Sequence, residues 1–88
     1  MRLTDHAEQR RSRRRIPVDV LSTIYDFGTS VHANGAVSLT LDRHTIALAS
    51  DGDRRKRSTL ERYQGCYIIV GDGENIVTVA RRRRRHRR

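Results

Sequence analysis

Two short apolar runs near the C-terminal end form the most hydrophobic stretch of this 88-residue chain. Residues 66–70 and 76–80 are rich in β-branched side chains, and a polar segment of Gly, Asp, Glu and Asn, residues 71–75, separates them. β-Branched runs on either side of such a turn predict a β-hairpin. No other part of the sequence is as apolar, so we expect this hairpin to form the centre of a sheet.

The turn of this hairpin decides which side chains share a face of the sheet. If Asp72 and Gly73 form a two-residue turn, Val70 faces Asn75 and Tyr67 faces Thr78. One face is then expected to pack under a helix, and it carries Cys66, Ile68, Val77 and Val79. The other face is expected to be partly open and carries Tyr67, Ile69, Ile76, Thr78 and Ala80. A shift by one residue would exchange the two faces.

Two earlier segments also have clear periodicities. Residues 30–41 alternate around Asn34-Gly35, a pair typical of a type I′ turn between a short first strand and a longer second one. Residues 17–27 place apolar side chains at helical spacing and predict an amphipathic helix, with Pro17 in its first turn and Gly28 as its C-cap. Its apolar face would hold Val20, Leu21, Ile24 and Phe27.

The N-terminal segment predicts a helix with an unusual inward stripe. Asp5 can cap this helix, with Glu8 three residues on as in a capping box, and the helix would end near Arg14. Because arginine is rarely buried, arginines in the stripe must pair with acids, extend to solvent or line a cleft. The stripe consists of Leu3, Ala7, Arg10 and Arg14, with His6 beside Arg10.

The segment between the two hairpins permits more than one interpretation. Asp42 can cap a helix that continues to about Ala49, or the preceding strand can continue to Ala49; we favour the helix. A polar loop would follow over residues 50–56. Ser58 to Glu61 then form a capping box for a short helix that Gly65 ends.

Together these elements predict a single α+β domain over residues 1–80, with two N-terminal helices packed on a small twisted antiparallel sheet. A core of this size is marginal on its own, and a homodimer would supply further buried surface. Residues 81–88 hold seven arginines and one histidine, so we expect them to form a disordered tail outside the core.

The distribution of charge indicates a polyanionic partner. The net charge is +9, of which the tail contributes +7 and residues 1–80 only +2. Since the guanidinium fork bonds phosphate oxygens in pairs, arginine clusters favour RNA or another nucleic acid. The candidate contacts are Arg11, Arg13, Arg15, Arg54, Arg55, Lys56, Arg57, Arg81 and Arg82. Alternatively, the run from Arg54 to Arg57 is a solvated surface, and for the tail we favour adhesion to nucleic acid or acidic surfaces without specificity.

Several classes of site and location find no support in the sequence. The single cysteine, Cys66, forms no intrachain disulfide and is expected to be a small buried hydrophobe. The four histidines are too scattered for a zinc site, and no phosphate-binding glycine loop is present. No cofactor or metal is therefore predicted. Without an export signal or a membrane-length apolar run, we expect a cytoplasmic protein with no membrane partner.

The N-terminal helix carries the residues best suited to chemistry on RNA. Metal-free cleavage needs a base for the 2′-hydroxyl proton, an acid for the leaving oxygen and cations for the phosphate. His6 would be the base, and Arg10 with Arg14 the phosphate clamp. Tyr67 or Thr78, on the sheet face beneath, would orient the RNA or donate a proton. In the alternative, His6 caps or packs locally and the two arginines form ion pairs. Their acidic partners would be Asp19, Asp26 or Glu61.

The same helix carries a motif found in a known family. The sequence His6-Ala7-x-x-Arg10-x-x-x-Arg14-x-Ile16, with the closing strand Val77-Thr78-Val79, resembles the bacterial family catalogued as domain of unknown function 4258. The resemblance spans about Leu3 to Arg81. It implies a RelE-like fold, whose relatives include toxins that cleave RNA without a metal and pair with an antitoxin protein. It also implies His6, Arg10 and Arg14 as the helix signature and Thr78 as the sheet signature. Arg15 departs from the glycine that members often carry there, and the arginine tail is not part of the pattern.

Two hypotheses for function follow. In the first, the chain is a RelE-like metal-independent endoribonuclease or translation-inhibiting toxin, with an antitoxin protein as a partner. In the second, it is a non-catalytic basic module that binds nucleic acid or an acidic partner protein through counterion release. A helix-turn-helix DNA binder is less well supported, because the junction at Ile16-Pro17 is abrupt and the second helix is apolar.

Overall fold

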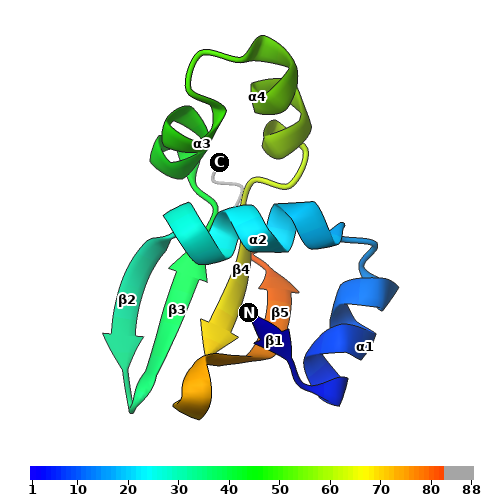
Figure 1. Ribbon diagram of the computed structural model, residues 1–88, viewed down its shortest axis with the longest axis vertical. Helices are drawn as coiled ribbons and strands as arrows, with labels where there is room; N and C mark the ends of the chain where they lie inside the picture. Colours follow the sequence, from blue (N-terminus) through cyan, green and yellow to red (C-terminus); the bar gives the residue numbers. More distant parts are fainter. Residues whose placement is uncertain (83–88) are drawn as a thin grey trace, which may run out of the picture.

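The chain folds as an α+β protein, as predicted, with four helices and a five-stranded mixed sheet in residues 1–82, which are the residues that the computed structural model describes (Figure 1). The elements are β1 (Arg2–Leu3), α1 (Asp5–Arg13), α2 (Val18–Phe27), β2 (Thr29–Ala33), β3 (Ala36–Thr40), α3 (Arg43–Ser50), α4 (Arg54–Glu61), β4 (Cys66–Val70), the short 3-10 turn η1 (Asp72–Glu74) and β5 (Asn75–Arg81). The domain thus extends beyond residue 80, because β5 ends at Arg81. Residues 83–88, which belong to the predicted disordered tail, lie outside the described part of the chain.

The sheet is mixed rather than antiparallel. Its strand order is β1-β5-β4-β3-β2, and β1 pairs with β5 in parallel, whereas the other neighbouring strands are antiparallel. The predicted antiparallel sheet did not include this parallel pair, because β1 contains only Arg2 and Leu3, too few residues to show an alternating pattern. β4 lies in the middle of the sheet, as its apolar sequence predicted.

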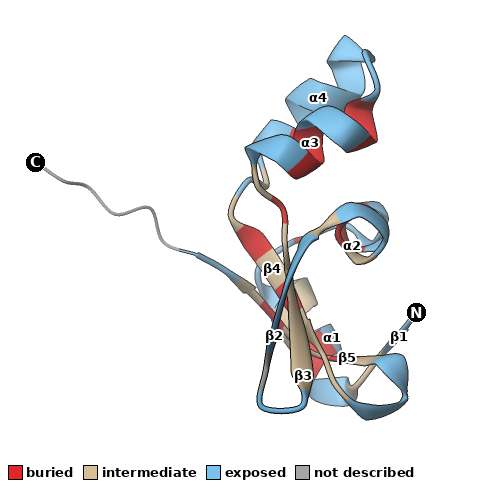
Figure 2. Ribbon diagram, turned by 90° about the vertical axis from the view of Figure 1, so that its left-hand side faces the viewer, coloured by how far each residue is buried: buried red, intermediate tan, exposed pale blue. Residues whose placement is uncertain are grey.

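The helices α1 and α2 lie on one face of the sheet, and the hydrophobic core lies between them and the strands. α2 packs against β3 and β4, and α1 packs against β5 (Figure 1). No helix of the described residues covers the opposite face (Figure 2). That face carries the half-buried side chains of Tyr67, Ile69 and Thr78. The core consists of Ala7, Ile16, Val20, Leu21, Ile24, Leu41, Ile46, Ala49, Leu60, Cys66, Ile68, Ile76 and Val79.

The β4–β5 hairpin differs in register from the prediction. Ile69 pairs with Thr78 but Val70 pairs with Ile76, so Val77 is an extra residue on β5. This bulge shifts the alternation of side chains by one position. Ile76 is therefore fully buried on the face that the helices cover, whereas Val77 is half-buried. The prediction exchanged these two side chains because it assumed a two-residue turn, whereas the chain forms the longer η1 turn before β5.

Two helix starts also differ from the prediction. Thr4, rather than Asp5, caps α1, and its hydroxyl accepts a hydrogen bond of 3.2 Å from the Ala7 backbone N–H. Asp53 caps α4, and its carboxylate accepts hydrogen bonds from the backbone N–H groups of Arg55 and Lys56. The helix therefore starts four residues before Ser58. The segment predicted as a loop is therefore partly helical. Both predictions chose a capping pattern that lies later in the sequence than the true one. The side chains that cap the two helices, Thr4 and Asp53, lie nearer the N-terminus.

The start of α3 agrees with the prediction. Asp42 caps this helix, and its carboxylate accepts a hydrogen bond of 2.9 Å from the backbone N–H of Thr45. Burial acts to raise the pKa of Asp42, but hydrogen bonds from Thr45 and Thr29 outweigh that effect and hold the pKa below its usual value. Helices α3 and α4 follow one another and extend beyond one end of the sheet (Figure 1).

The segment from α2 to β3 contains two glycines with different roles. Asn34 and Gly35 have φ angles of 50° and 77°, as the predicted type I′ turn requires, and they join two strands of five residues each. Gly28 follows α2 with an ordinary φ of −57°, but a Cβ atom there would lie 2.5 Å from the carbonyl oxygen of Ile24. The chain therefore requires glycine at position 28, where its backbone comes close to the end of α2. Phe27, predicted to face the core, is 46% exposed.

Candidate anion-binding site

The C-terminal end of α1 and the end of β5 meet in one place. Helix α1 ends at Arg13, Arg14 is its C-cap, and Arg15 takes a left-handed φ of 55° that turns the chain toward the buried side chain of Ile16. On β5, Arg81 pairs with Cys66, whose side chain faces the helix-covered side of the sheet. Because directly paired residues share a face, Arg81 projects on the same side as α1.

These segments enclose a pocket of about 440 Å³. Its lining combines three arginines with a tyrosine and two apolar side chains, and no acidic residue belongs to it. The lining residues are Arg13, Arg14, Ile16, Tyr63, Cys66 and Arg81. Three arginines from two distant segments therefore line one concave surface, an arrangement suited to binding a phosphate group.

Two residues of this arginine pocket, Arg81 and Cys66, are held in place by a hydrogen bond and by packing respectively. Arg81 donates a hydrogen bond of 2.8 Å from Nη2 to the carbonyl oxygen of Arg62, which orients its guanidinium and leaves other N–H groups available. Cys66 is only 1% exposed, so it is a small buried residue, as predicted, and it also belongs to the lining of the pocket. Burial raises the pKa of its thiol, whereas the positive charges of Arg81 and Arg14 act in the opposite direction.

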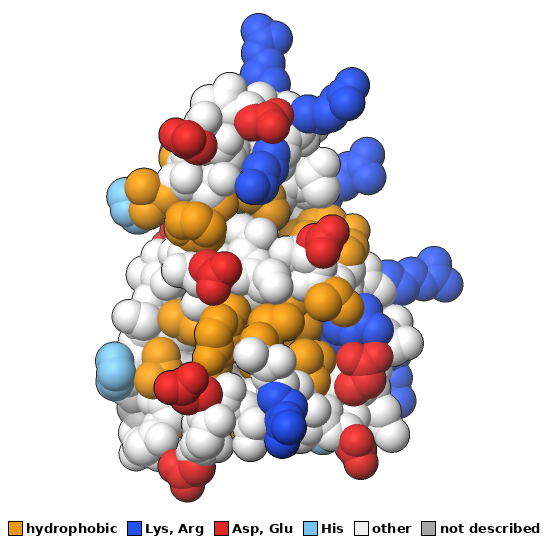
Figure 3. All heavy atoms as spheres, in the orientation of Figure 1, with side chains coloured by type: hydrophobic (Ala, Val, Ile, Leu, Met, Phe, Trp, Pro, Cys, Tyr) orange, Lys and Arg blue, Asp and Glu red, His pale blue; other side chains and the backbone are white. Residues whose placement is uncertain are grey.

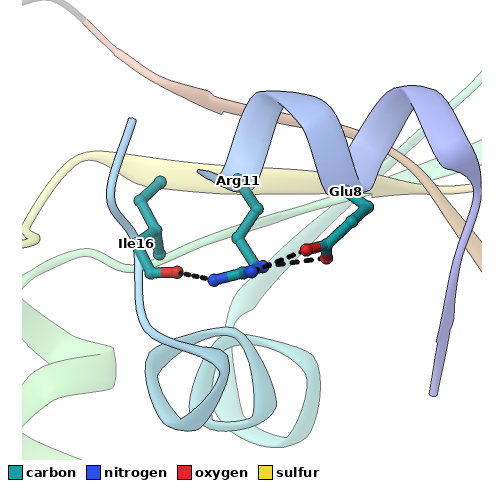
Figure 4. Close-up of polar contacts among 3 residues, drawn as sticks. All are labelled: Glu8, Arg11 and Ile16. Atoms are coloured by element: carbon teal, nitrogen blue, oxygen red, sulfur yellow. Dashed lines mark hydrogen bonds and ion pairs between the residues drawn. The ribbon is translucent and has the colours of Figure 1, made fainter. Parts of the chain in front are cut away.

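Arg11, one of the predicted nucleic-acid contacts, has a structural role at the end of α1 (Figure 4). Its Nε and Nη2 donate to the two carboxylate oxygens of Glu8 at 2.9 and 2.6 Å, and its Nη1 donates to the carbonyl oxygen of Ile16 at 2.9 Å. The bond from Arg11 holds the pKa of Glu8 below its usual value, and the pKa of Arg11 is raised in turn. Arg11 therefore holds the junction between α1 and α2 in place, and three of its five N–H donors are engaged there.

The structure does not assemble the constellation predicted for catalysis. His6 and Arg10 lie on α1, exposed and half-buried respectively, but neither lines the pocket that contains Arg14. Arg14 lies eight positions after His6, which corresponds to about 12 Å along a helix axis. Tyr67 and Thr78 lie on the sheet face opposite α1, not beneath it, because Ile68 and Val79 beside them in sequence point into the core.

The predicted ion pairs of the arginine stripe are also not formed. Within residues 1–82, the salt bridges are Arg11–Glu8 and Arg57–Glu61, so Glu61 pairs with its own helix and not with α1. On the open face of the sheet, the Arg82 guanidinium lies 5.3 Å from the ring centre of Tyr67. The last two described arginines therefore lie on opposite faces of the sheet.

The remaining basic candidates form a separate surface. Arg54, Arg55 and Lys56 are exposed in the first turn of α4, away from the arginine pocket. Figure 3 shows Lys and Arg side chains mainly on the upper and right-hand sides of that view, over α4 and α1. A second groove, of about 360 Å³, lies between α2 and α4, and its lining mixes both signs of charge through Asp19, Asp53, Arg55 and Lys56. It is therefore less suited to a polyanion than the arginine pocket.

Tyr63 is the functional candidate that the sequence analysis missed. It follows α4 and comes to the pocket only because the turn to β4 bends back beside α1. A signal was present: Tyr63 lies three residues before Cys66 in a turn that ends in glycine, which places this residue near the start of the central strand. In the described residues, no three His, Cys, Asp or Glu side chains cluster as a metal site would require.

Searches for related proteins gave no match among protein-family models, curated proteins or solved structures. The resemblance to domain of unknown function 4258 and to the RelE-like fold therefore stays a prediction. Over residues 1–82, no helix has the length and apolar character needed to cross a membrane.

Proposed function

We propose that this protein binds nucleic acid through phosphate groups held in the arginine pocket. The observation that carries the proposal is the convergence of Arg13, Arg14 and Arg81 on one concave surface whose lining contains no acidic side chain. Arginine forks bond phosphate oxygens in pairs, and the release of counterions from the nucleic acid favours binding. Because the recognised groups are phosphates, an RNA strand and a single-stranded DNA of equal length should bind with similar affinity.

A salt titration of the protein truncated after Arg82 separates pocket binding from tail adhesion. Binding of a labelled single-stranded RNA is measured by fluorescence anisotropy for this protein and for the full chain. We expect the truncated protein to bind more weakly than the full chain but still to reach saturation. A plot of log K against log salt concentration should have a slope of roughly −2, because each of three phosphate contacts contributes about −0.7. If truncation abolishes binding at low salt, the tail and not the pocket binds nucleic acid, and the proposal is wrong.

RNA cleavage is the second candidate function. It is favoured by His6, which is exposed on α1 and lies on the helix whose other end enters the arginine pocket. An RNA strand held at Arg14 and extending along α1 would bring another linkage to His6 and Arg10. A RelE-like toxin with an antitoxin partner is the specific form of this candidate.

Cleavage by the truncated protein in the presence of a chelator tests this candidate. We expect discrete RNA fragments that disappear in His6→Ala, because only a base at that position would remove the 2′-hydroxyl proton. His44→Ala is the matched control, since His44 is also an exposed helical histidine but lies on α3. Intact RNA, or fragments that His6→Ala leaves unchanged, would limit the function to binding.

A further inference from the structure

The edge strand β2 has five residues in regular register and contains no Asp, Glu, Lys or Arg. Within the described residues it has a neighbour on one side only, so its outer backbone N–H and C=O groups have no strand partner. Natural sheets protect such edges with charged residues, prolines or bulges. Here residues 28–41 contain no Asp, Glu, Lys or Arg, although 33% of the chain is charged. The strand also lacks proline, and its register with β3 is regular.

The opposite edge of the same sheet is protected. It is formed by β1, which has only two residues, and one of them is Arg2. The contrast shows that the protective devices are present in this fold and are missing at β2. An unprotected edge of five residues is suited to pairing with another strand.

Exposed apolar side chains accompany this edge. Val31, in the middle of β2, is 60% exposed, and Phe27, two residues before the strand, is 46% exposed. Leu48 of α3 is 53% exposed, and α3 adjoins the start of β2 through the hydroxyl groups of Thr45 and Thr29, which lie 3.2 Å apart. Three of the five exposed large hydrophobic side chains thus belong to segments at this edge.

We propose that β2 is a self-association surface, at which two copies of this chain pair their β2 strands antiparallel about a two-fold axis. A strand without charge is complementary to itself, which favours a second copy over a charged partner. The pairing that overlaps all five residues places Val31 of one copy opposite Val31 of the other. The two sheets then form one continuous sheet.

The backbone geometry of the β2–β3 hairpin is consistent with this register. The type I′ turn joins Ala33 and Ala36 as a hydrogen-bonded pair, and such pairs alternate along an antiparallel ladder. The backbones of Ser30 and His32 therefore point outward. In the proposed dimer each Ser30 bonds to His32 of the other copy. The two Val31 residues form the closer, non-hydrogen-bonded pair, with Cα atoms about 4.5 Å apart.

The charge distribution does not oppose this dimer at close range. The arginine pocket involves β5, which is separated from β2 by β4 and β3, so the two pockets lie at the far ends of the joined sheet. In the view of Figure 3, no Lys or Arg side chain is visible on the left-hand side, where β2 lies. Since each copy has a net charge of +9, salt should screen the remaining repulsion and strengthen the dimer.

Sedimentation velocity of the full chain, freed of nucleic acid, tests the proposal. We expect the mass to rise from 10.2 kDa to about twice that value with increasing protein concentration, at lower concentrations in higher salt. Val31→Lys places two like charges opposite one another, and should raise the dissociation constant about tenfold or more. Ser30→Pro removes an outward N–H without removing a bond to β3, and should have a similar effect.

Val18→Lys is the matched control, because Val18 is 50% exposed and lies at the start of α2. It adds the same charge and should leave the dissociation constant unchanged. Circular dichroism confirms that each variant is folded. A chain that stays monomeric at every concentration overturns the proposal. So does a dimer that Val31→Lys and Ser30→Pro leave intact, or one that weakens with salt as a nucleic-acid bridge would.

Discussion

Ile76→Ala should be among the most destabilising single substitutions in this protein, lowering the free energy of unfolding by about 2–5 kcal/mol. Ile76 is 0% exposed and packs in the core between the sheet and the N-terminal helices. Its truncation removes buried apolar surface and leaves a cavity that the close-packed strands cannot fill. Urea denaturation of the wild type and the variant, with equal m values, measures the difference.

Val77→Ala is the natural control for this substitution. Val77 is the neighbouring residue, is also β-branched, and is half-buried at the bulge of β5. Its truncation should cost about 1 kcal/mol or less, because it leaves no closed cavity. The alternation of an unbulged hairpin predicts the opposite ranking. If Val77→Ala proves the more damaging of the two, β5 has the register of a two-residue turn and the bulge is wrong.

These two residues show what could be read from the sequence and what could not. The hairpin itself was predictable, because two β-branched runs flank a polar turn and no other segment is as apolar. Its register was not, because Asp72-Gly73 fits a two-residue turn as well as it fits part of the η1 turn. One extra residue at Val77 then reverses every face assignment before it on β5. Local signals identify strands, but the count of residues in a turn is settled by packing.

The arginines of α1 illustrate a similar limit at the candidate site. Sequence spacing left three possibilities for the arginines of the stripe, namely ion pairs, extension to solvent or a place in a cleft, and Arg14 lines a cleft. Spacing could not show that Arg11, three residues earlier, would be held by Glu8 and the carbonyl of Ile16, because the latter bond depends on the left-handed turn at Arg15. Nor could it show that Arg81 would join Arg14. That meeting depends on the end of β5 reaching the end of α1, which is a tertiary contact between opposite ends of the chain.

Reversing the charge of the arginine pocket should have the largest effect on function. In the protein truncated after Arg82, we expect Arg14→Glu with Arg81→Glu to weaken RNA binding by about 100-fold or more, since repulsion replaces the attraction of two guanidinium groups for phosphate. The magnitude of the salt slope should fall by about 0.7 for each phosphate that the variant no longer neutralises. Anisotropy titrations over a series of salt concentrations measure both quantities.

A variant with the same change in net charge distinguishes the pocket from a general loss of positive charge. Arg54→Glu with Arg55→Glu alters exposed residues at the start of α4 and should weaken binding far less. Equal losses of affinity in the two double variants would mean that RNA is attracted by net charge alone and that the pocket is not its site. Arg14→Lys with Arg81→Lys completes the comparison, because it keeps the charge and removes the planar fork. Intermediate affinity for this variant, with unchanged thermal stability, is what bidentate phosphate binding predicts. Full affinity would show that charge alone, without fork geometry, holds the phosphate.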